Sequence, residues 1–218
     1  MSNYHIKHLE EYFQVHRKSV RDPEGFWEEV AEEHFIWRKR WDNVLSWDFE
    51  KPEVKWFEGA KLNITENCID RHLKIRGEKT AILFEPNDPK EAAEHITYQQ
   101  LYERVNQFAN VLKEQGVKKG DRVCIYLPMI PELAISTLAC ARIGAIHSVV
   151  FAGFSATALS TRINDSDCKM VITSDGSYRG AKTIDLKGIV DDALEDCLGV
   201  ETVLVAKRIN SEIEMKKG

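Results

Sequence analysis

Arg179 and Lys182 are two cations three positions apart in a glycine-containing segment that reads SDGSYRGAKTIDLK. An arginine offers a planar fork of donors and a lysine a point charge, so the two could converge on one phosphate group. The order of residues invites comparison with a P-loop, GxxxxGK[ST], in which the second glycine directly precedes the lysine and a helix follows. Here Ala181 separates Gly180 from Lys182, and no helical pattern follows at once, so we reject a P-loop. The spacing alone favours two solvated surface charges over a phosphate site.

The segment FAGFS, residues 151–155, is a second candidate for ligand binding. The small residues Ala152 and Gly153 allow a ligand to approach the backbone, and Ser155 is predicted to begin a helix, whose N-terminus favours anions. An ordinary strand-to-helix turn would have the same composition. His147 lies inside an apolar strand pattern and is predicted to be a core histidine. The sequence contains no HExxH, GxSxG or HxH motif, so we predict no catalytic residue and no metal ligand.

The elements that would position these residues alternate between strand and helix patterns from Thr97 onward. Continuous apolar runs of this kind are typical of strands buried on both faces, as in a parallel sheet covered by helices. The expected fold class is therefore α/β, a doubly wound and mainly parallel sheet with helices on both faces. The predicted strands are residues 123–127, 145–151, 169–174 and 202–206. Ligands of open α/β sheets bind beyond the carboxyl ends of the strands, where both candidate segments lie.

Turn and cap residues support this assignment. Thr97 and Gln100 form a capping box pattern at the start of a helix that Gly116 is expected to end. Pro131 suits the first turn of the next helix. All five tryptophans lie before residue 60, in a segment that reads as a short helix, starting at Asp22, followed by irregular chain. We therefore divide the chain into an aromatic-rich lead segment, residues 1–62, and an α/β region, residues 63–218.

Composition excludes several classes of protein. The 218 residues carry a net charge of −5 with both signs mixed, which argues against a general nucleic-acid-binding surface. We find no apolar run of the roughly 18 residues that a membrane span needs, and no signal-peptide pattern. The five cysteines are scattered without a CxxC motif, which fits buried thiols in a reducing compartment. We expect a cytoplasmic protein that binds small molecules, without nucleic-acid or membrane partners.

Three long blocks resemble the N-terminal part of AMP-forming acetyl-coenzyme A synthetase, an acetate–CoA ligase of the adenylate-forming acyl-CoA synthetase superfamily: residues 54–73, 116–155 and 162–187. The resemblance extends from about Trp27 to the end. It implies a ligase whose substrates are acetate, Mg-ATP and coenzyme A, with acetyl-adenylate as the intermediate. In that family, the loop that matches YRGAK contacts the phosphorylated ADP portion of coenzyme A. The resemblance therefore assigns Arg179, Gly180, Ala181 and Lys182 to coenzyme A, and places Gly153 near its pantetheine arm.

Two departures from the family pattern limit what this sequence implies. The family usually has arginine at the position of Lys182, and lysine keeps the charge without the bidentate geometry. The family's Ser/Thr/Gly-rich phosphate loop, its ribose-binding aspartate and its catalytic lysine do not occur here, so we expect the chain to be the first third of the enzyme and inactive alone. Alternatives are a standalone coenzyme A or nucleotide-binding module, and a ligase for propionate or acetoacetate.

Overall fold

The computed structural model describes residues 6–180 and 182–215. The chain divides into two compact units, residues 1–67 and 68–218, called here the smaller and the larger unit. The larger unit holds the candidate residues that the sequence indicated. None of the helices within the described residues is long and apolar enough to cross a membrane.

Two helices and a hairpin make up most of the smaller unit: α1 (Leu9–Arg21), α2 (Pro23–His34), β1 (Asn43–Asp48) and β2 (Glu53–Glu58). Asp22 caps α2 by accepting a hydrogen bond from the Gly25 N–H, and Pro23 is the first residue of α2, as predicted. The prediction of irregular chain after α2 is wrong, because β1 and β2 pair antiparallel. Their apolar residues face one another across the ladder, with Trp47 opposite Val54, and such cross-strand pairs stabilise a hairpin.

A broken helix follows the hairpin. The pieces are α3 (Ile64–Cys68), a 3-10 turn η1 (Asp70–His72) and α4 (Leu73–Arg76). Ile69 lies at the break with φ −123° and ψ −68°, outside helical geometry, while its side chain is buried. The helix is therefore interrupted at a residue whose side chain is buried. Next, β3 (Thr80–Phe84) and β4 (Glu94–Thr97) form an antiparallel hairpin.

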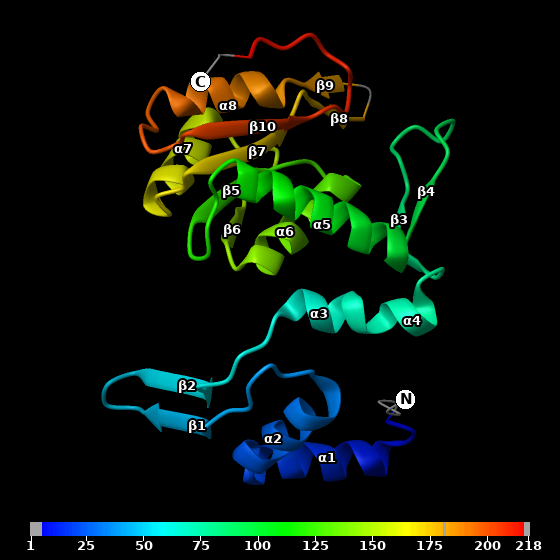
Figure 1. The fold of residues 1–218 in the computed structure, drawn as a ribbon, viewed down its shortest axis with the longest axis vertical. Coiled ribbons are helices and arrows are strands. Elements are labelled where there is room, and N and C mark those ends of the chain that lie inside the picture. Colours follow the sequence, from blue (N-terminus) through cyan, green and yellow to red (C-terminus); the bar gives the residue numbers. More distant parts are fainter. Residues whose placement is uncertain (1–5, 181, 216–218) are drawn as a thin grey trace. The chain divides into compact units, whose positions relative to one another are not determined.

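Four parallel strands form the central sheet of the larger unit, in the order β10-β7-β5-β6 (Figure 1). Their bounds are Arg122–Tyr126 for β5, Ile146–Val149 for β6, Met170–Ser174 for β7 and Thr202–Ala206 for β10. The helices that alternate with them are α5 (Tyr98–Glu114), α6 (Pro131–Ile143), α7 (Ala156–Asp165) and α8 (Leu186–Leu194). The predicted parallel α/β fold is therefore confirmed.

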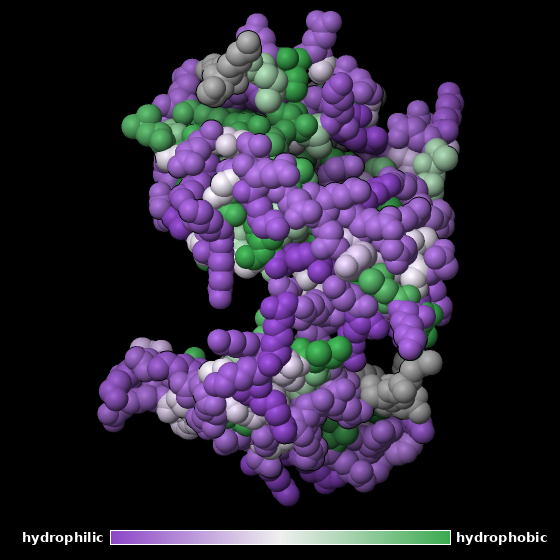
Figure 2. Space-filling view, viewed as in Figure 1, coloured by the Kyte–Doolittle hydropathy of each residue, from purple (hydrophilic) through white to green (hydrophobic). Residues whose placement is uncertain are grey.

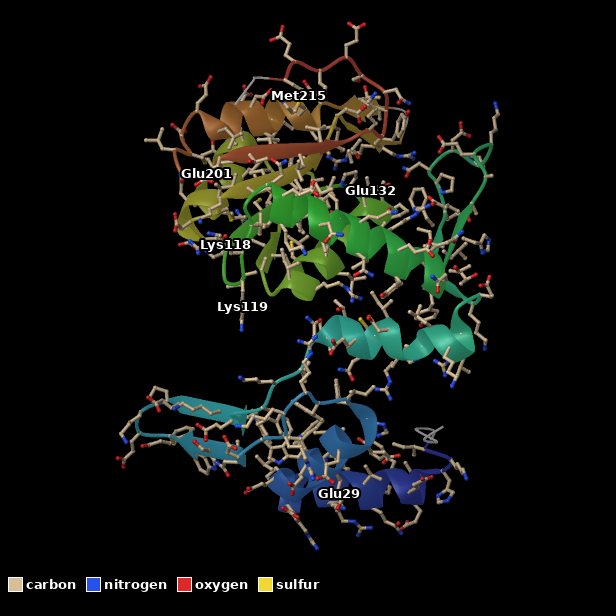
Figure 3. All side chains as sticks on the ribbon, viewed as in Figure 1. Glu29, Lys118, Lys119, Glu132, Glu201 and Met215 are labelled. Carbon is tan, nitrogen blue, oxygen red and sulfur yellow. The ribbon has the colours of Figure 1, made fainter. Side chains whose placement is uncertain are left out.

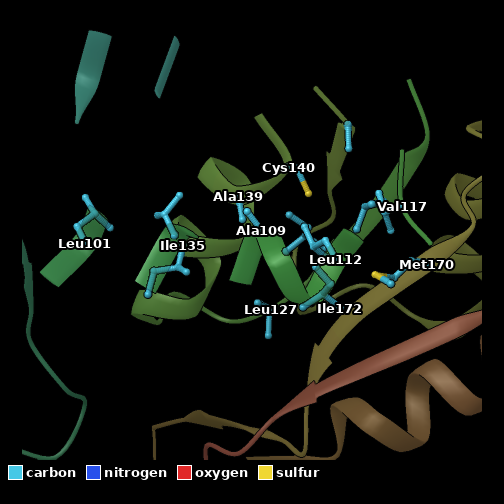
Figure 4. Close-up of a cluster of buried hydrophobic side chains, with 14 of the residues drawn as sticks. Leu101, Ala109, Leu112, Val117, Leu127, Ile135, Ala139, Cys140, Met170 and Ile172 are labelled. Carbon is cyan, nitrogen blue, oxygen red and sulfur yellow. The ribbon is translucent and has the colours of Figure 1, made fainter. Parts of the chain in front are cut away.

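Alternate residues of the strands enter two separate cores, one on each face of the sheet. Val123 and Ile125 of β5 pack with α5 and α6, in the cluster drawn in Figure 4. Cys124 and Tyr126 of the same strand pack with α7 and α8. Because successive side chains of a strand point to opposite faces, helices must cover both faces of the sheet.

The two edge strands are less buried than the central pair. Every residue of β7 is buried, whereas all five residues of β10 are partly exposed, and Figure 2 shows apolar surface over this edge. Among the described residues β6 pairs with β5 alone. His147 lies on β6 and is exposed, so its assignment to the core is wrong. The apolar run predicted the strand correctly, but an edge strand exposes positions that a central strand buries.

Candidate functional site

A pocket of about 490 Å³ opens at the carboxyl ends of β5, β6 and β7. Its wall combines the segment after β5, the FAGFS turn after β6, the segment after β7 and part of the β3–β4 hairpin. Both candidate segments contribute, because Gly153 and Arg179 line the same pocket. Most of the remaining lining is apolar: Phe84, Leu127, Pro128, Met129, Ile130, Leu133, Val149, Val150, Phe151, Ala152 and Ile184. The pocket therefore suits a ligand with an apolar part and an anionic end.

The segment after β7 is a hairpin and not the loop that its polar composition suggested. Strand β8 (Ser177–Arg179) pairs antiparallel with β9 (Lys182–Ile184), and Arg179 stands directly opposite Lys182. Gly180 takes a left-handed φ of +61°, which glycine adopts without steric cost in a tight turn. Both cations are exposed. Arg179 lines the pocket, whereas Ala181 lies outside the described residues.

A side-chain cap sets the start of the helix that follows this hairpin, α8, at Leu186. The cap is Asp185, whose carboxylate accepts a hydrogen bond from the Gly188 N–H at 2.8 Å. Lys182 and Thr183 lie in a strand and not at a helix N-terminus, so the rejection of a P-loop is confirmed.

Gly153 lies directly against the ring of Phe151 in the FAGFS turn. Its N–H donates to the Phe151 carbonyl oxygen at 2.8 Å. A β-carbon at Gly153 would lie 2.4 Å from the ring atom Cε1 of Phe151, so any side chain there would displace the ring. The predicted cap of α7 is present, since the Ser155 hydroxyl accepts from the Ala158 N–H at 3.3 Å.

A buried tyrosine that the sequence gave no reason to single out holds this turn. Tyr126, the last residue of β5, is fully buried and donates its hydroxyl to the Phe154 carbonyl oxygen at 2.7 Å. Thr173 of β7 donates its hydroxyl to the Tyr126 carbonyl oxygen at 3.0 Å. Burial raises the pKa of the Tyr126 phenol, which keeps its proton available for this bond. The two bonds link the turn to both central strands.

Asp175 plays a similar part for the chain after β10. Its buried carboxylate accepts backbone hydrogen bonds from Arg208 at 2.6 Å, Ile209 at 3.1 Å and Ser211 at 3.1 Å. Burial alone would raise the pKa of this carboxyl, but the backbone N–H donors outweigh it and hold the pKa below its ordinary value. Asp175 is therefore ionised at neutral pH and fixes Arg208 at the rim of the pocket. A polar residue directly after a buried strand was the available sequence signal.

A second cavity, of about 440 Å³, lies beside α8 and β10 and includes Glu201 and Met215, both labelled in Figure 3. Its polar centre is Lys187, which is buried and pairs with Asp191 at 2.6 Å. The ammonium group also donates to the Glu214 carbonyl oxygen at 3.0 Å. These contacts give the buried Lys187 ammonium group an ion-pair partner and a hydrogen-bond acceptor within the fold. Within residues 6–180 and 182–215, no group of three or more His, Cys, Asp or Glu side chains could hold a metal ion.

Comparisons with known proteins find matching families, similar sequences and a similar structure. Residues 69–217 match the family described as "AMP-binding enzyme", and residues 12–68 match "Acetyl-coenzyme A synthetase N-terminus". The chain is 51% identical over 210 residues to "Acetyl-coenzyme A synthetase" of Halorhodospira halophila, covering 96% of this chain and 32% of that protein. It is 54% identical over 207 residues to the same-named protein of Alkalilimnicola ehrlichii, covering 95% and 32%.

A solved structure with the same fold is the acetoacetyl-CoA synthetase from Streptomyces lividans. The TM-score is 0.84 at 27% sequence identity, and the match covers 91% of this chain and 30% of that one. The chain thus spans about a third of the length of the proteins it matches, since the shares are 32% for the curated relatives and 30% for the structure.

Proposed function

This chain belongs to the AMP-binding enzyme family, and on that premise we propose that it forms part of an acetate–coenzyme A ligase. In the proposed reaction, an acetate oxygen attacks the α-phosphate of Mg-ATP, which gives acetyl-adenylate and pyrophosphate. The thiol of coenzyme A then attacks the acetyl carbonyl, which gives acetyl-CoA and releases AMP. We assign the pocket at the carboxyl ends of the strands to coenzyme A.

One observation carries this assignment, namely the pairing of Arg179 directly with Lys182 across the β8–β9 ladder. Like charges directly opposite one another on a hairpin are destabilising. A bound phosphate would neutralise both and would turn their repulsion into two attractive contacts. We propose that the phosphorylated ADP end of coenzyme A binds at Arg179 and Lys182, with residues 180 and 181 as further contacts, and that the pantetheine arm passes Gly153 along the apolar wall.

The choice of acetate rests on the curated relatives. The proteins named acetyl-coenzyme A synthetase are 51% and 54% identical to this chain, whereas the acetoacetyl-CoA synthetase is 27% identical. The larger identity supports acetate over acetoacetate as the acyl substrate. Comparing acetate, propionate and acetoacetate as substrates of the product of the complete reading frame tests this choice, and a preference for either of the other two acids would refute it.

We further propose that the 218-residue chain alone does not form the adenylate. Adenylation needs donors and cations around the transferring phosphate, and removing a single such contact costs roughly 10²–10³ in rate. The printed sequence offers no Ser/Thr/Gly-rich phosphate loop with its lysine. The purified chain, incubated with acetate, Mg-ATP and labelled pyrophosphate, should therefore show no exchange into ATP. Exchange clearly above a blank without protein would contradict this.

The test of the coenzyme A assignment is Arg179→Ala in the product of the complete reading frame. A hydrogen bond to a charged group contributes about 1.5–3 kcal/mol, so the KM for coenzyme A should rise about tenfold or more. Acetate-dependent ATP–pyrophosphate exchange should persist, because it precedes thiol attack. The matched control is Arg21→Ala, an exposed arginine of α1 in the smaller unit. Loss of exchange with unchanged coenzyme A saturation would refute the assignment.

A further inference from the structure

Arg208 lies just after β10 and lines the same pocket as Arg179, but it makes a different set of contacts. Its guanidinium carbon lies 5.6 Å from the ring centroid of Phe84 and 5.2 Å from that of Tyr178. Both distances are within the range of cation–π attraction. Phe84 ends β3 and Tyr178 is the central residue of β8, so one planar group contacts the β3–β4 hairpin and the β8–β9 hairpin together.

Two further interactions hold Arg208, one through its backbone and one through its side chain. The backbone N–H of Arg208 donates to Asp175, a buried carboxylate directly after β7. Its side chain, only 18% exposed, pairs with Glu91 at 3.4 Å in the connection between β3 and β4. Arg208 is thus fixed to the sheet through its backbone and to two neighbouring hairpins through its side chain.

The β8–β9 hairpin needs such a support. Each of its strands has three residues, and an isolated two-stranded hairpin is marginally stable at best in water. It also carries Arg179 opposite Lys182, whose repulsion loosens it further. The contact between Arg208 and Tyr178 involves the residue directly before Arg179 in β8.

We propose that Arg208 is a positioning residue for coenzyme A binding, acting through Tyr178 to hold the β8–β9 hairpin in place. This proposal rests on the function proposed above. A guanidinium group is planar and stacks on aromatic rings better than an ammonium group does, so lysine at this position would keep the charge and lose part of the support.

The experiment compares Arg208→Ala and Arg208→Lys with wild type in the product of the complete reading frame. Hydrogen–deuterium exchange at labelling times of seconds should accelerate in peptides covering residues 176–184, more for alanine than for lysine. The KM for coenzyme A should rise about threefold or more for Arg208→Ala, as expected for losing a partly buried cation–π contact. Acetate-dependent ATP–pyrophosphate exchange should remain near wild type. Arg104→Ala, which removes a paired surface arginine near β4, should change none of these quantities.

Unchanged hydrogen exchange in residues 176–184 of Arg208→Ala would overturn the proposal. Faster exchange with an unchanged KM would also overturn it, provided that Arg179→Ala does raise the KM. If Arg179→Ala leaves the KM unchanged, the function assigned to the pocket fails, and the hydrogen exchange then decides separately whether Arg208 supports the hairpin. A double variant with both alanines should raise the KM by less than the product of the two single effects, because both act through the same contact.

Discussion

Replacing Asp175 by asparagine should destabilise the larger unit, because this carboxylate organises the chain that enters the pocket after β10. The substitution keeps the size of the side chain and removes its charge. One oxygen remains to accept from Arg208 and Ile209, but the amide group would bring an N–H toward the Ser211 N–H, which now donates to Oδ2 at 3.1 Å. A hydrogen bond to a charged group contributes about 1.5–3 kcal/mol, so we expect the free energy of unfolding to fall by about 2–3 kcal/mol.

The pH dependence of this loss follows from the direction of the pKa shift. The folded-state pKa of Asp175 is depressed, so the ionised carboxylate stabilises the fold fully above its unfolded pKa of about 3.9. This contribution is lost as pH falls through the lower, folded-state pKa. The difference between wild type and Asp175→Asn should therefore be largest near neutral pH and should shrink below about pH 4.

Urea unfolding of both proteins at pH 7 and at several acidic pH values measures this difference. The control is Asp192→Asn, which removes the same charge from an exposed position on α8 and should change stability by no more than about 0.5 kcal/mol. Equal stability of wild type and Asp175→Asn at pH 7 would refute the reasoning. So would a difference that grows as the solution becomes more acidic.

Three further substitutions or modifications test other parts of the structure. Tyr126→Phe removes the hydroxyl that donates to Phe154 and should cost about 1–2 kcal/mol in urea unfolding; no change would show that the bond does not form. Gly153→Leu should displace the Phe151 ring and raise the KM for coenzyme A, with little effect on thermal stability because that ring is 71% exposed; a normal KM would contradict the pocket assignment. Burial raises the pKa of the Cys124 and Cys140 thiols to about 12, so neither should react with iodoacetamide at pH 8 in the native state; modification of either without unfolding would contradict this.

The parallel sheet could be predicted from the sequence because its strands are continuous apolar runs. The runs at β5 and β7 encode burial on both faces, and the capping box at Thr97 and the turn at Gly116 bound a helix by local chemistry. These signals lie within a few residues of the element that they specify. The fold class therefore needed no information from distant parts of the chain, whereas the order of the strands in the sheet came from the structure alone.

The β8–β9 hairpin could not be predicted in the same way. Strands β8 and β9 have three residues each and contain Arg179, Lys182 and a glycine turn, so their composition is that of a loop. Arg208, which contacts Tyr178 of β8, lies 30 positions further along the chain, so no local pattern indicates this contact. The roles of Tyr126 and Asp175 were missed for the same reason, since their partners are 28 and more than 30 positions away.

The central claim is that the β8–β9 hairpin binds the phosphorylated end of coenzyme A. The most direct measurement compares coenzyme A with 3′-dephospho-coenzyme A as substrates of wild type and Arg179→Ala, in the product of the complete reading frame. Wild type should prefer coenzyme A by about tenfold or more in kcat/KM, and Arg179→Ala should lose most of that preference, because the lost contact is to the phosphate. A wild type that does not distinguish the two substrates, or a variant that keeps the full preference, would contradict the claim.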